Sequence, residues 1–127
     1  MNILLLVGGL LGLSSVMMAA YVDHSLGLYL NGKALNSLLT AVKYHQLYAI
    51  IISMMGLYLP MQINPPFKSW LNRSAYLFIV GILLFSFSIY CSILFSFPRI
   101  IYGTPIGGIL LMVGWVCLIR ASLLKIK

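Results

Sequence analysis

The chain has 127 residues, of which 62% are hydrophobic and only 7% are charged, and its mean hydropathy is +1.08. Soluble domains carry about 25% charged residues, and a domain of this size buries only about two-thirds of the surface that its unfolded chain exposes. The composition therefore excludes a water-soluble domain, a disordered segment and a disulfide-rich scaffold. It indicates that lipid is the solvent for most of the chain.

The charge is strongly unbalanced, because eight Lys and Arg face a single acid, Asp23, for a net charge of +7. The cations stand singly, between or near the ends of apolar runs, instead of forming a basic stripe with aromatic residues. This pattern argues against nucleic acid as a partner. The two cysteines, Cys91 and Cys117, lie inside apolar runs without CxxC or Cys/His spacing, which predicts two small buried side chains.

Four apolar segments are each long enough to cross a bilayer, which takes about 20 mostly apolar residues. In chain order the predicted spanning helices are residues 3–22, 44–63, 75–97 and 104–124. The first lacks a basic leader and exceeds the apolar length of a signal peptide, so we expect it to be a retained helix. Little sequence remains for another domain. We therefore expect one membrane domain over residues 1–127, an all-α bundle of four transmembrane helices with up-down-up-down topology.

Three stretches between the spans carry local signals. Apolar residues with the i, i+3, i+4, i+7 spacing predict a short interfacial helix over residues 33–43 that leads into the second span. These residues are Leu35, Leu38, Leu39 and Val42. The Asn-Pro-Pro sequence at 64–66 predicts a break after the second span. Thr104 and Pro105 are typical of an N-cap and first helical position, and so predict the start of the fourth span.

Small residues recur at helical spacing along every predicted span. In lipid, helices associate through such residues because they allow the backbones to approach closely. We therefore expect each helix to turn its small residues toward a neighbour and its bulky residues toward lipid. The glycines expected at these packing faces are Gly8, Gly12, Gly56, Gly81, Gly107, Gly108 and Gly114.

Several short motifs point to one family. They are LFSFSIY (84–90), TPIGG (104–108), the following Gly114-Trp115, AAYVDHSL (19–26) and TAVKYH (40–45). Together they resemble the YgdD-like, transmembrane-protein-256-like family of small four-helix membrane proteins, over nearly the whole chain. The resemblance implies a four-span bundle in the bacterial inner membrane with no established molecular activity. Tyr48 stands where many members have a second His, so this sequence does not support a mechanism built on that His.

The basic residues predict the orientation in the membrane. With four spans, both termini and the loop between the second and third spans share one side. That side holds Lys68, Arg73, Arg120, Lys125 and Lys127, whereas the opposite side holds Lys33, Lys43 and Arg99. Because Lys and Arg are enriched on the cytoplasmic side, we expect both termini to be cytoplasmic.

In this orientation the polar motifs all fall in the extracytoplasmic half of the bilayer. The candidate polar cluster consists of Asp23, His24, Tyr44, His45, Ser86, Ser88, Tyr90 and Thr104. Unpaired polar groups are costly in hydrocarbon, so these side chains should meet one another, water or a ligand. The cluster is then either a binding site or a structural connection between helices.

Each member of the cluster has a structural interpretation beside the functional one. His45 lies on the small-residue stripe of the second span, where it could bond a neighbouring helix or form part of a site. His24 beside Asp23 is either the polar end of a helix or a base with an orienting carboxylate. The Ser86 and Ser88 hydroxyls commonly bond carbonyls of their own helix in such positions.

No catalytic residues, metal site or cofactor are predicted. One carboxylate excludes a two-carboxylate mechanism, no Ser stands in a nucleophile elbow, and the two His lack metal-ligand spacing. We therefore expect a protein that is not an enzyme. Two functions fit: a non-catalytic bundle that binds a membrane-protein partner or lipid, and an oligomeric channel or permease whose path starts at the candidate polar cluster.

Overall fold

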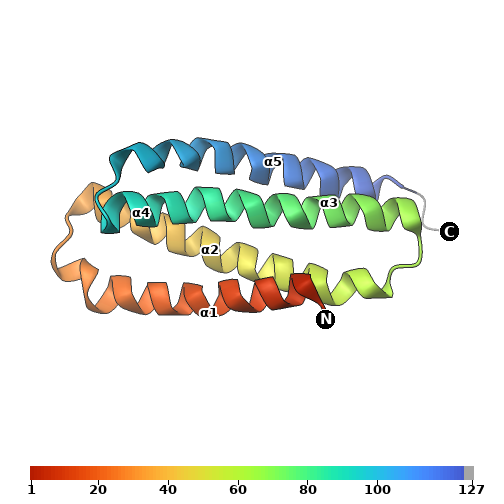
Figure 1. The fold of residues 1–127 in the computed structure, drawn as a ribbon, viewed down its shortest axis with the longest axis horizontal. Coiled ribbons are helices and arrows are strands. Elements are labelled where there is room, and N and C mark those ends of the chain that lie inside the picture. Colours follow the sequence, from red (N-terminus) through yellow and green to blue (C-terminus); the bar gives the residue numbers. More distant parts are fainter. Residues whose placement is uncertain (125–127) are drawn as a thin grey trace.

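The computed structural model describes residues 1–124, and within this range the chain forms long antiparallel helices (Figure 1). The α-helices are α1 (Ile3–His24), α2 (Gly32–Tyr58), α3 (Pro65–Ile82), α4 (Ser88–Leu94) and α5 (Gly103–Ser122). A π-helical segment, η3 (Leu83–Phe87), joins α3 to α4, and 3-10 turns form η1 (Leu26–Leu28), η2 (Leu59–Met61) and η4 (Pro98–Tyr102). Joined end to end, these elements form four rods in chain order, each long and apolar enough to span a membrane: Ile3–Leu28, Gly32–Met61, Pro65–Leu94 and Pro98–Ser122.

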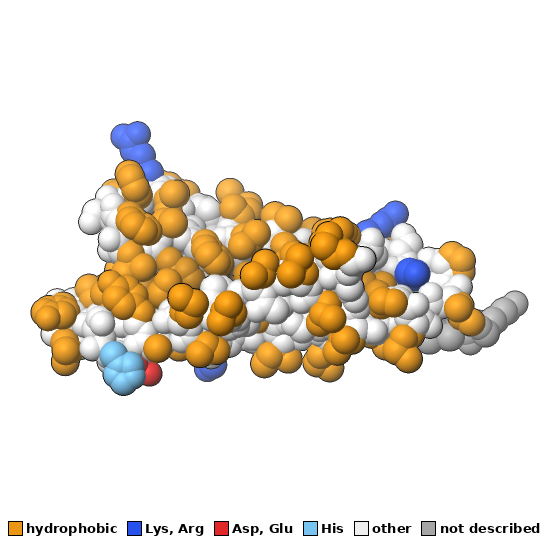
Figure 2. All heavy atoms as spheres, turned by 60° about the horizontal axis from the view of Figure 1, so that its bottom comes forward, with side chains coloured by type: hydrophobic (Ala, Val, Ile, Leu, Met, Phe, Trp, Pro, Cys, Tyr) orange, Lys and Arg blue, Asp and Glu red, His pale blue; other side chains and the backbone are white. Residues whose placement is uncertain are grey.

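The rods run up, down, up and down, which defines two ends of the bundle (Figure 1). The terminal end holds the start of α1, the end of α2, the start of α3 and the end of α5. The loop end holds η1 and η4. Hydrophobic side chains cover the surface between these ends, and charged side chains lie mainly near them (Figure 2). The outer surface therefore matches a lipid environment.

The helices associate as two pairs. α1 packs along α2 to form the first pair, and α5 packs along α3 to form the second pair, which also includes η3 and α4. Contact between the pairs runs mainly through α2, which meets α3, η3 and α4. The seam between the pairs is therefore a separate interface from those inside them.

Inside the first pair, two glycines bring the backbones of α1 and α2 together. A Cβ added to Gly56 would lie 2.6 Å from the Leu5 backbone nitrogen, and one added to Gly8 would lie 2.7 Å from that of Ser53. Real Cβ atoms essentially never approach other atoms so closely. No larger residue fits at these two positions without moving a helix.

The second pair is built in the same way. A Cβ on Gly107 would lie 2.7 Å from the Gly81 carbonyl oxygen, and one on Gly114 would lie 2.6 Å from the Phe78 ring. A Cβ on Gly81 would lie 2.7 Å from the Leu111 side chain. Glycine therefore sets the separation between α3 and α5, as it does between α1 and α2.

A side chain in each pair donates a hydrogen bond to the carbonyl oxygen of one of these packing glycines. The Asn2 amide donates to the Gly56 carbonyl at 2.6 Å. The Ser74 hydroxyl donates to the Gly114 carbonyl at 2.8 Å. Both bonds cross from one helix of a pair to the other, so close backbone approach and interhelical hydrogen bonding occur at the same places.

Gly12 and Gly108, expected at packing faces, do not lie at close contacts. A Cβ on Gly12 would meet nothing within 4 Å, and one on Gly108 would only reach the Phe85 ring at 3.9 Å. The reason is geometric, because the buried line of each helix passes beside these positions. On α1 this line is Leu4, Gly8, Leu11, Ser15 and Val22, and on α5 it is Gly107, Leu111, Gly114, Cys117 and Ala121.

The helix bounds differ from the sequence prediction in three places. Thr104 is not the N-cap of the fourth span, because α5 begins at Gly103, with Tyr102 at the N-cap position and no side-chain cap. Residues 33–43 do not form a separate interfacial helix, because α2 is continuous from Gly32 to Tyr58. Its 27 residues are longer than a bilayer core requires, so its first turns extend past the apolar region without a break. The third rod starts at Pro65 instead of residue 75, since Asn64 caps the helix by accepting from the Phe67 N–H at 3.1 Å.

Candidate functional site

His45 lies at the centre of a hydrogen-bonded chain between helices. It is only 1% exposed on α2, with Nδ1 3.0 Å from the Tyr90 hydroxyl and Nε2 3.2 Å from the Ser14 hydroxyl. The Ser14 hydroxyl itself donates to the Leu11 carbonyl at 3.1 Å. Ser14 can therefore accept from an Nε2–H, which leaves Nδ1 to accept from Tyr90. In this arrangement both imidazole nitrogens and the hydroxyls of Ser14 and Tyr90 have hydrogen-bond partners.

This network connects both helix pairs. Ser14 belongs to α1, His45 to α2 and Tyr90 to α4, so a single imidazole bonds across the first pair and across the seam. The Phe87 ring packs beside it, with its centroid 5.2 Å from that of His45 and 5.5 Å from that of Tyr90. The imidazole is thus enclosed by aromatic rings and satisfied by hydrogen bonds.

The serines of the cluster form two further hydrogen-bonded groups. Ser86 donates across the seam to the Ala41 carbonyl on α2 at 2.8 Å. Ser88 lies 2.5 Å from the Thr104 hydroxyl of α5 and also donates to the Phe85 carbonyl of its own helical rod at 3.0 Å. The predicted cluster is therefore divided into three separate groups, which are centred on His45, Ser86 and Ser88.

The π-helical segment explains why two sequence motifs occur together. LFSFSIY supplies most of η3, and TPIGG opens α5. Gly107 of the second motif packs directly on the backbone at Phe85 of the first, while Thr104 meets Ser88. A π-helix often marks a functional or specially packed position. Here it is the surface on which α5 begins its close approach to the third rod.

Three predicted members lie outside these groups. Asp23 and His24 are exposed at the end of α1, and neither side chain has a hydrogen bond or ion pair among residues 1–124. Tyr44 is 39% exposed and packs its ring on Phe85, with centroids 5.0 Å apart. His24 and Tyr44 therefore do not converge with His45, Ser86, Tyr90 and Thr104 as expected. Asp23 and His24 lie on the exposed side of the end of α1, whereas Val22 just before them packs in the core with Ile89 and Tyr90.

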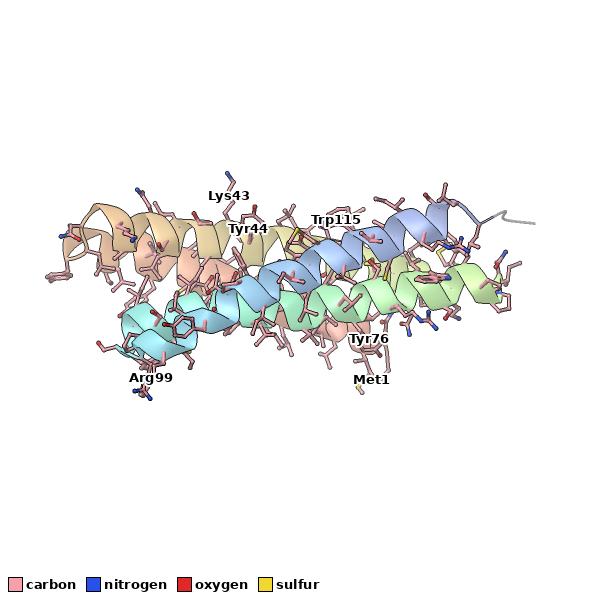
Figure 3. The ribbon with its side chains drawn as sticks, turned by 90° about the horizontal axis from the view of Figure 1, so that it is seen from above. Met1, Lys43, Tyr44, Tyr76, Arg99 and Trp115 are labelled. Atoms are coloured by element: carbon pink, nitrogen blue, oxygen red, sulfur yellow. The ribbon has the colours of Figure 1, made fainter. Side chains whose placement is uncertain are left out.

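Sequence reasoning missed some of the polar contacts. Ser14 was not on the predicted packing stripe of α1, although a serine inside an uncharged 20-residue run is a signal for an interhelical bond. The Trp115 indole N–H donates to the Tyr48 hydroxyl at 2.8 Å, which links α5 to α2. Figure 3 shows Trp115 on the same side of the bundle as Tyr44. Tyr48 and Trp115 are too distant in sequence for any spacing rule to pair them.

The surface near His45 is closed. A groove of about 450 Å³ between α1 and the third rod is lined by Ser14 and Phe87, but its lining does not include His45. Ser14 and Phe87 therefore separate the imidazole from lipid. Within residues 1–124, no three His, Cys, Asp or Glu side chains gather into a group that could hold a metal ion.

The comparisons with known proteins assign the family. Residues 18–108 match the family described as "Protein of unknown function (DUF423)". The chain belongs to this family. The match includes His45, Ser86, Ser88, Tyr90 and Thr104 and leaves out the α1 partner, Ser14.

DUF423 relatives are membrane proteins by name. A "UPF0382 membrane protein" of Haemophilus influenzae is 32% identical, over 87% of this chain and 86% of its own length. Similar proteins of Staphylococcus aureus (26% identical, 96% of each chain) and Staphylococcus epidermidis (28% identical, 97% of each chain) carry the same name. No solved structure matches the chain. The names and the four spans agree that this DUF423 chain is an all-α integral membrane protein.

Proposed function

We propose that this DUF423 protein is a non-catalytic scaffold of the bacterial inner membrane that binds a membrane-protein partner or lipid. The supporting observation is the enclosure of His45, which is 1% exposed and bonded to Ser14 and Tyr90. A transport pathway or active site needs its ionisable group to be reachable by solute. A side chain with satisfied hydrogen bonds on three helices instead acts as a structural connection.

Flux through the protein is the direct test. Purified protein in liposomes with an imposed pH gradient should conduct protons no faster than protein-free vesicles. His45→Ala should lower the thermal stability of the bundle, and His24→Ala should not, because His24 is exposed without a partner in the described range. Proton or small-ion flux that His45→Ala abolishes and His24→Ala preserves would overturn the scaffold and favour an oligomeric channel.

The proposal includes an orientation with both termini in the cytoplasm, supported by five Lys and Arg on that side against three on the other. A reporter fused after Lys127 should be active in the cytoplasm, and one inserted within residues 31–36 should be active outside it. The opposite pattern would reverse the orientation. It would not contradict the scaffold function.

The finer family assignment also belongs to the proposal. The LFSFSIY and TPIGG motifs support placing the chain with the YgdD-like, transmembrane-protein-256-like proteins. Because these motifs meet where Gly107 packs on Phe85, members of that group should share a π-helical segment in the third rod. A solved member with a regular α-helix there would contradict this assignment.

A further inference from the structure

The seam between the helix pairs is open at the terminal end. A groove of about 750 Å³ lies there between the start of α1, the end of α2 and the start of α3. Figure 3 shows Met1 and Tyr76, which both line it, on the same edge of the bundle. A volume of this size suits a small molecule or part of a lipid. The lining residues used below are Ile3, Leu4, Leu59, Lys68, Asn72 and Tyr76.

One wall of the groove is polar and belongs to α3. Lys68, Asn72 and Tyr76 follow one another at intervals of four residues and so project from one face of the helix. No hydrogen bond or ion pair joins these three side chains to any residue in the range 1–124. The opposite wall, from α1 and α2, is largely apolar. The groove therefore offers a cation and hydrogen-bond donors beside a hydrocarbon surface.

The charges favour an anion. The only acidic side chain of the chain is Asp23, at the loop end, so no acidic side chain lies near Lys68. Further positive charge lies near the terminal end, where the guanidinium carbons of Arg73 and Arg120 are 4.9 Å and 5.7 Å from the centre of the Trp70 ring. Uncompensated cations at a helix end attract the phosphates of anionic lipids.

The depth of the groove favours a lipid over a soluble anion. Lys68 lies in the first turns of α3, and Tyr76 lies eight residues later, about 12 Å further along the axis at 1.5 Å per residue. A phosphodiester beside Lys68 and Asn72 would thus have its glycerol near Tyr76 and its acyl chains along Ile3 and Leu4. Only an amphiphile uses both the polar and the apolar wall.

We propose that this groove binds the phosphate headgroup of an anionic phospholipid, with Lys68 and Asn72 on the phosphate and Tyr76 on the glycerol backbone. The inference rests on the proposed scaffold function and names its lipid class. The lipid would join the two pairs at the terminal end, as the His45 network joins them from the middle of α1 and α2. The bound lipid is thus part of the bundle.

Native mass spectrometry of the full chain in detergent tests the inference, with phosphatidylglycerol titrated against phosphatidylcholine. The wild-type chain should retain phosphatidylglycerol in preference. Lys68→Gln should weaken this retention about fivefold, the share of one cation at a membrane surface. Tyr76→Phe should weaken it about threefold through one lost hydrogen bond. Lys43→Gln is the matched control, because Lys43 is exposed and points away from the bundle (Figure 3).

Three outcomes would overturn the inference. They are equal retention of the two lipids, unchanged retention in both groove variants, and equal losses in Lys68→Gln and Lys43→Gln. A separate measurement uses sn-glycerol 3-phosphate. If this soluble headgroup binds as tightly as the lipid, the ligand of the groove is a soluble phosphate compound and the inference of a lipid is wrong. If the protein conducts protons but still prefers phosphatidylglycerol, only the scaffold function is contradicted. If it neither conducts protons nor prefers phosphatidylglycerol, only the lipid site is contradicted.

Discussion

The contacts inside the helix pairs differ from the contacts between the pairs in how closely glycine lets the helices approach. Inside the pairs, glycines such as Gly8 and Gly107 bring backbone against backbone. Across the seam, side chains make the polar contacts, as in the bonds from His45 to Tyr90, from Trp115 to Tyr48 and from Ser86 to the Ala41 carbonyl. The backbone contacts permit one separation only, whereas side-chain contacts can be remade by rotation. We therefore expect substitutions at the contacts inside the pairs to cost more stability than substitutions at the seam.

The largest effect should come from Gly107→Ala, which places a methyl group 2.7 Å from the Gly81 carbonyl oxygen. We expect the free energy of unfolding to fall by about 3 kcal/mol, near the upper end for overpacking. Gly108→Ala, with 3.9 Å to its nearest neighbour, should change it by less than about 0.5 kcal/mol. Reversible unfolding in mixed micelles measures both. Similar losses for the two variants would show that the close backbone contact at Gly107 does not determine the stability of the second pair.

The first pair offers the same comparison with a smaller expected effect. Gly8→Ala should cost about 2 kcal/mol, because the Ser53 side chain can partly move away while its backbone nitrogen, at 2.7 Å, cannot. Gly12→Ala meets nothing within 4 Å and should be neutral or slightly stabilising, since Ala is the better helix former. A Gly12 variant as damaging as the Gly8 variant, in the same unfolding assay, would show that α1 packs on another face.

Across the seam, a double-mutant cycle on His45→Ala and Tyr90→Phe should give a coupling free energy of about 1 kcal/mol, within the range for hydrogen bonds in membranes. The control cycle pairs His45→Ala with Tyr44→Phe, because Tyr44 packs its ring on Phe85 and has no hydrogen bond to His45. That coupling should be close to zero. If the two couplings are equal, the His45–Tyr90 bond does not hold the seam.

The smallest effect is expected for Trp115→Phe, which keeps a ring near Phe78 but removes the indole donor to Tyr48. A loss of about 0.6 kcal/mol is the average for an interhelical hydrogen bond in a membrane protein. Tyr48→Phe should cost a similar amount, and the double variant should cost no more than either single one. Additive losses would mean that Trp115 and Tyr48 act through separate contacts.

The spans could be predicted because apolar runs of this length have no other stable state in lipid. The start of α3 at Pro65 was missed, since Lys68 and Arg73 lower the hydropathy of turns that still begin with a good cap. Packing faces were harder to predict. In lipid both faces of a helix are apolar, so the sequence could not tell that the contact line passes Gly8 and misses Gly12.

For the candidate site, the small-residue stripe predicts that His45 faces a neighbouring helix, and the structure buries it there. Its partners could not be derived. Ser14 acquires its role only when α1 packs on α2, and Tyr48 and Trp115 only when the pairs dock; no local pattern encodes the angles of that packing. The exposed position of His24 depends on which side of the end of α1 faces the other helices, which is likewise a property of the assembled bundle.

The π-helical segment also limits which insertions and deletions the chain can tolerate. One residue more or fewer in an α-helix turns everything beyond it by about 100°. A deletion within Leu83–Phe87 would therefore leave Pro65–Ile82 packed on α5, while Tyr90 would rotate away from His45 and Ser88 away from Thr104. The third rod thus contacts its neighbours with one face before the π-helical segment and with a rotated face after it. The number of residues in this segment keeps both faces in contact with their partner helices.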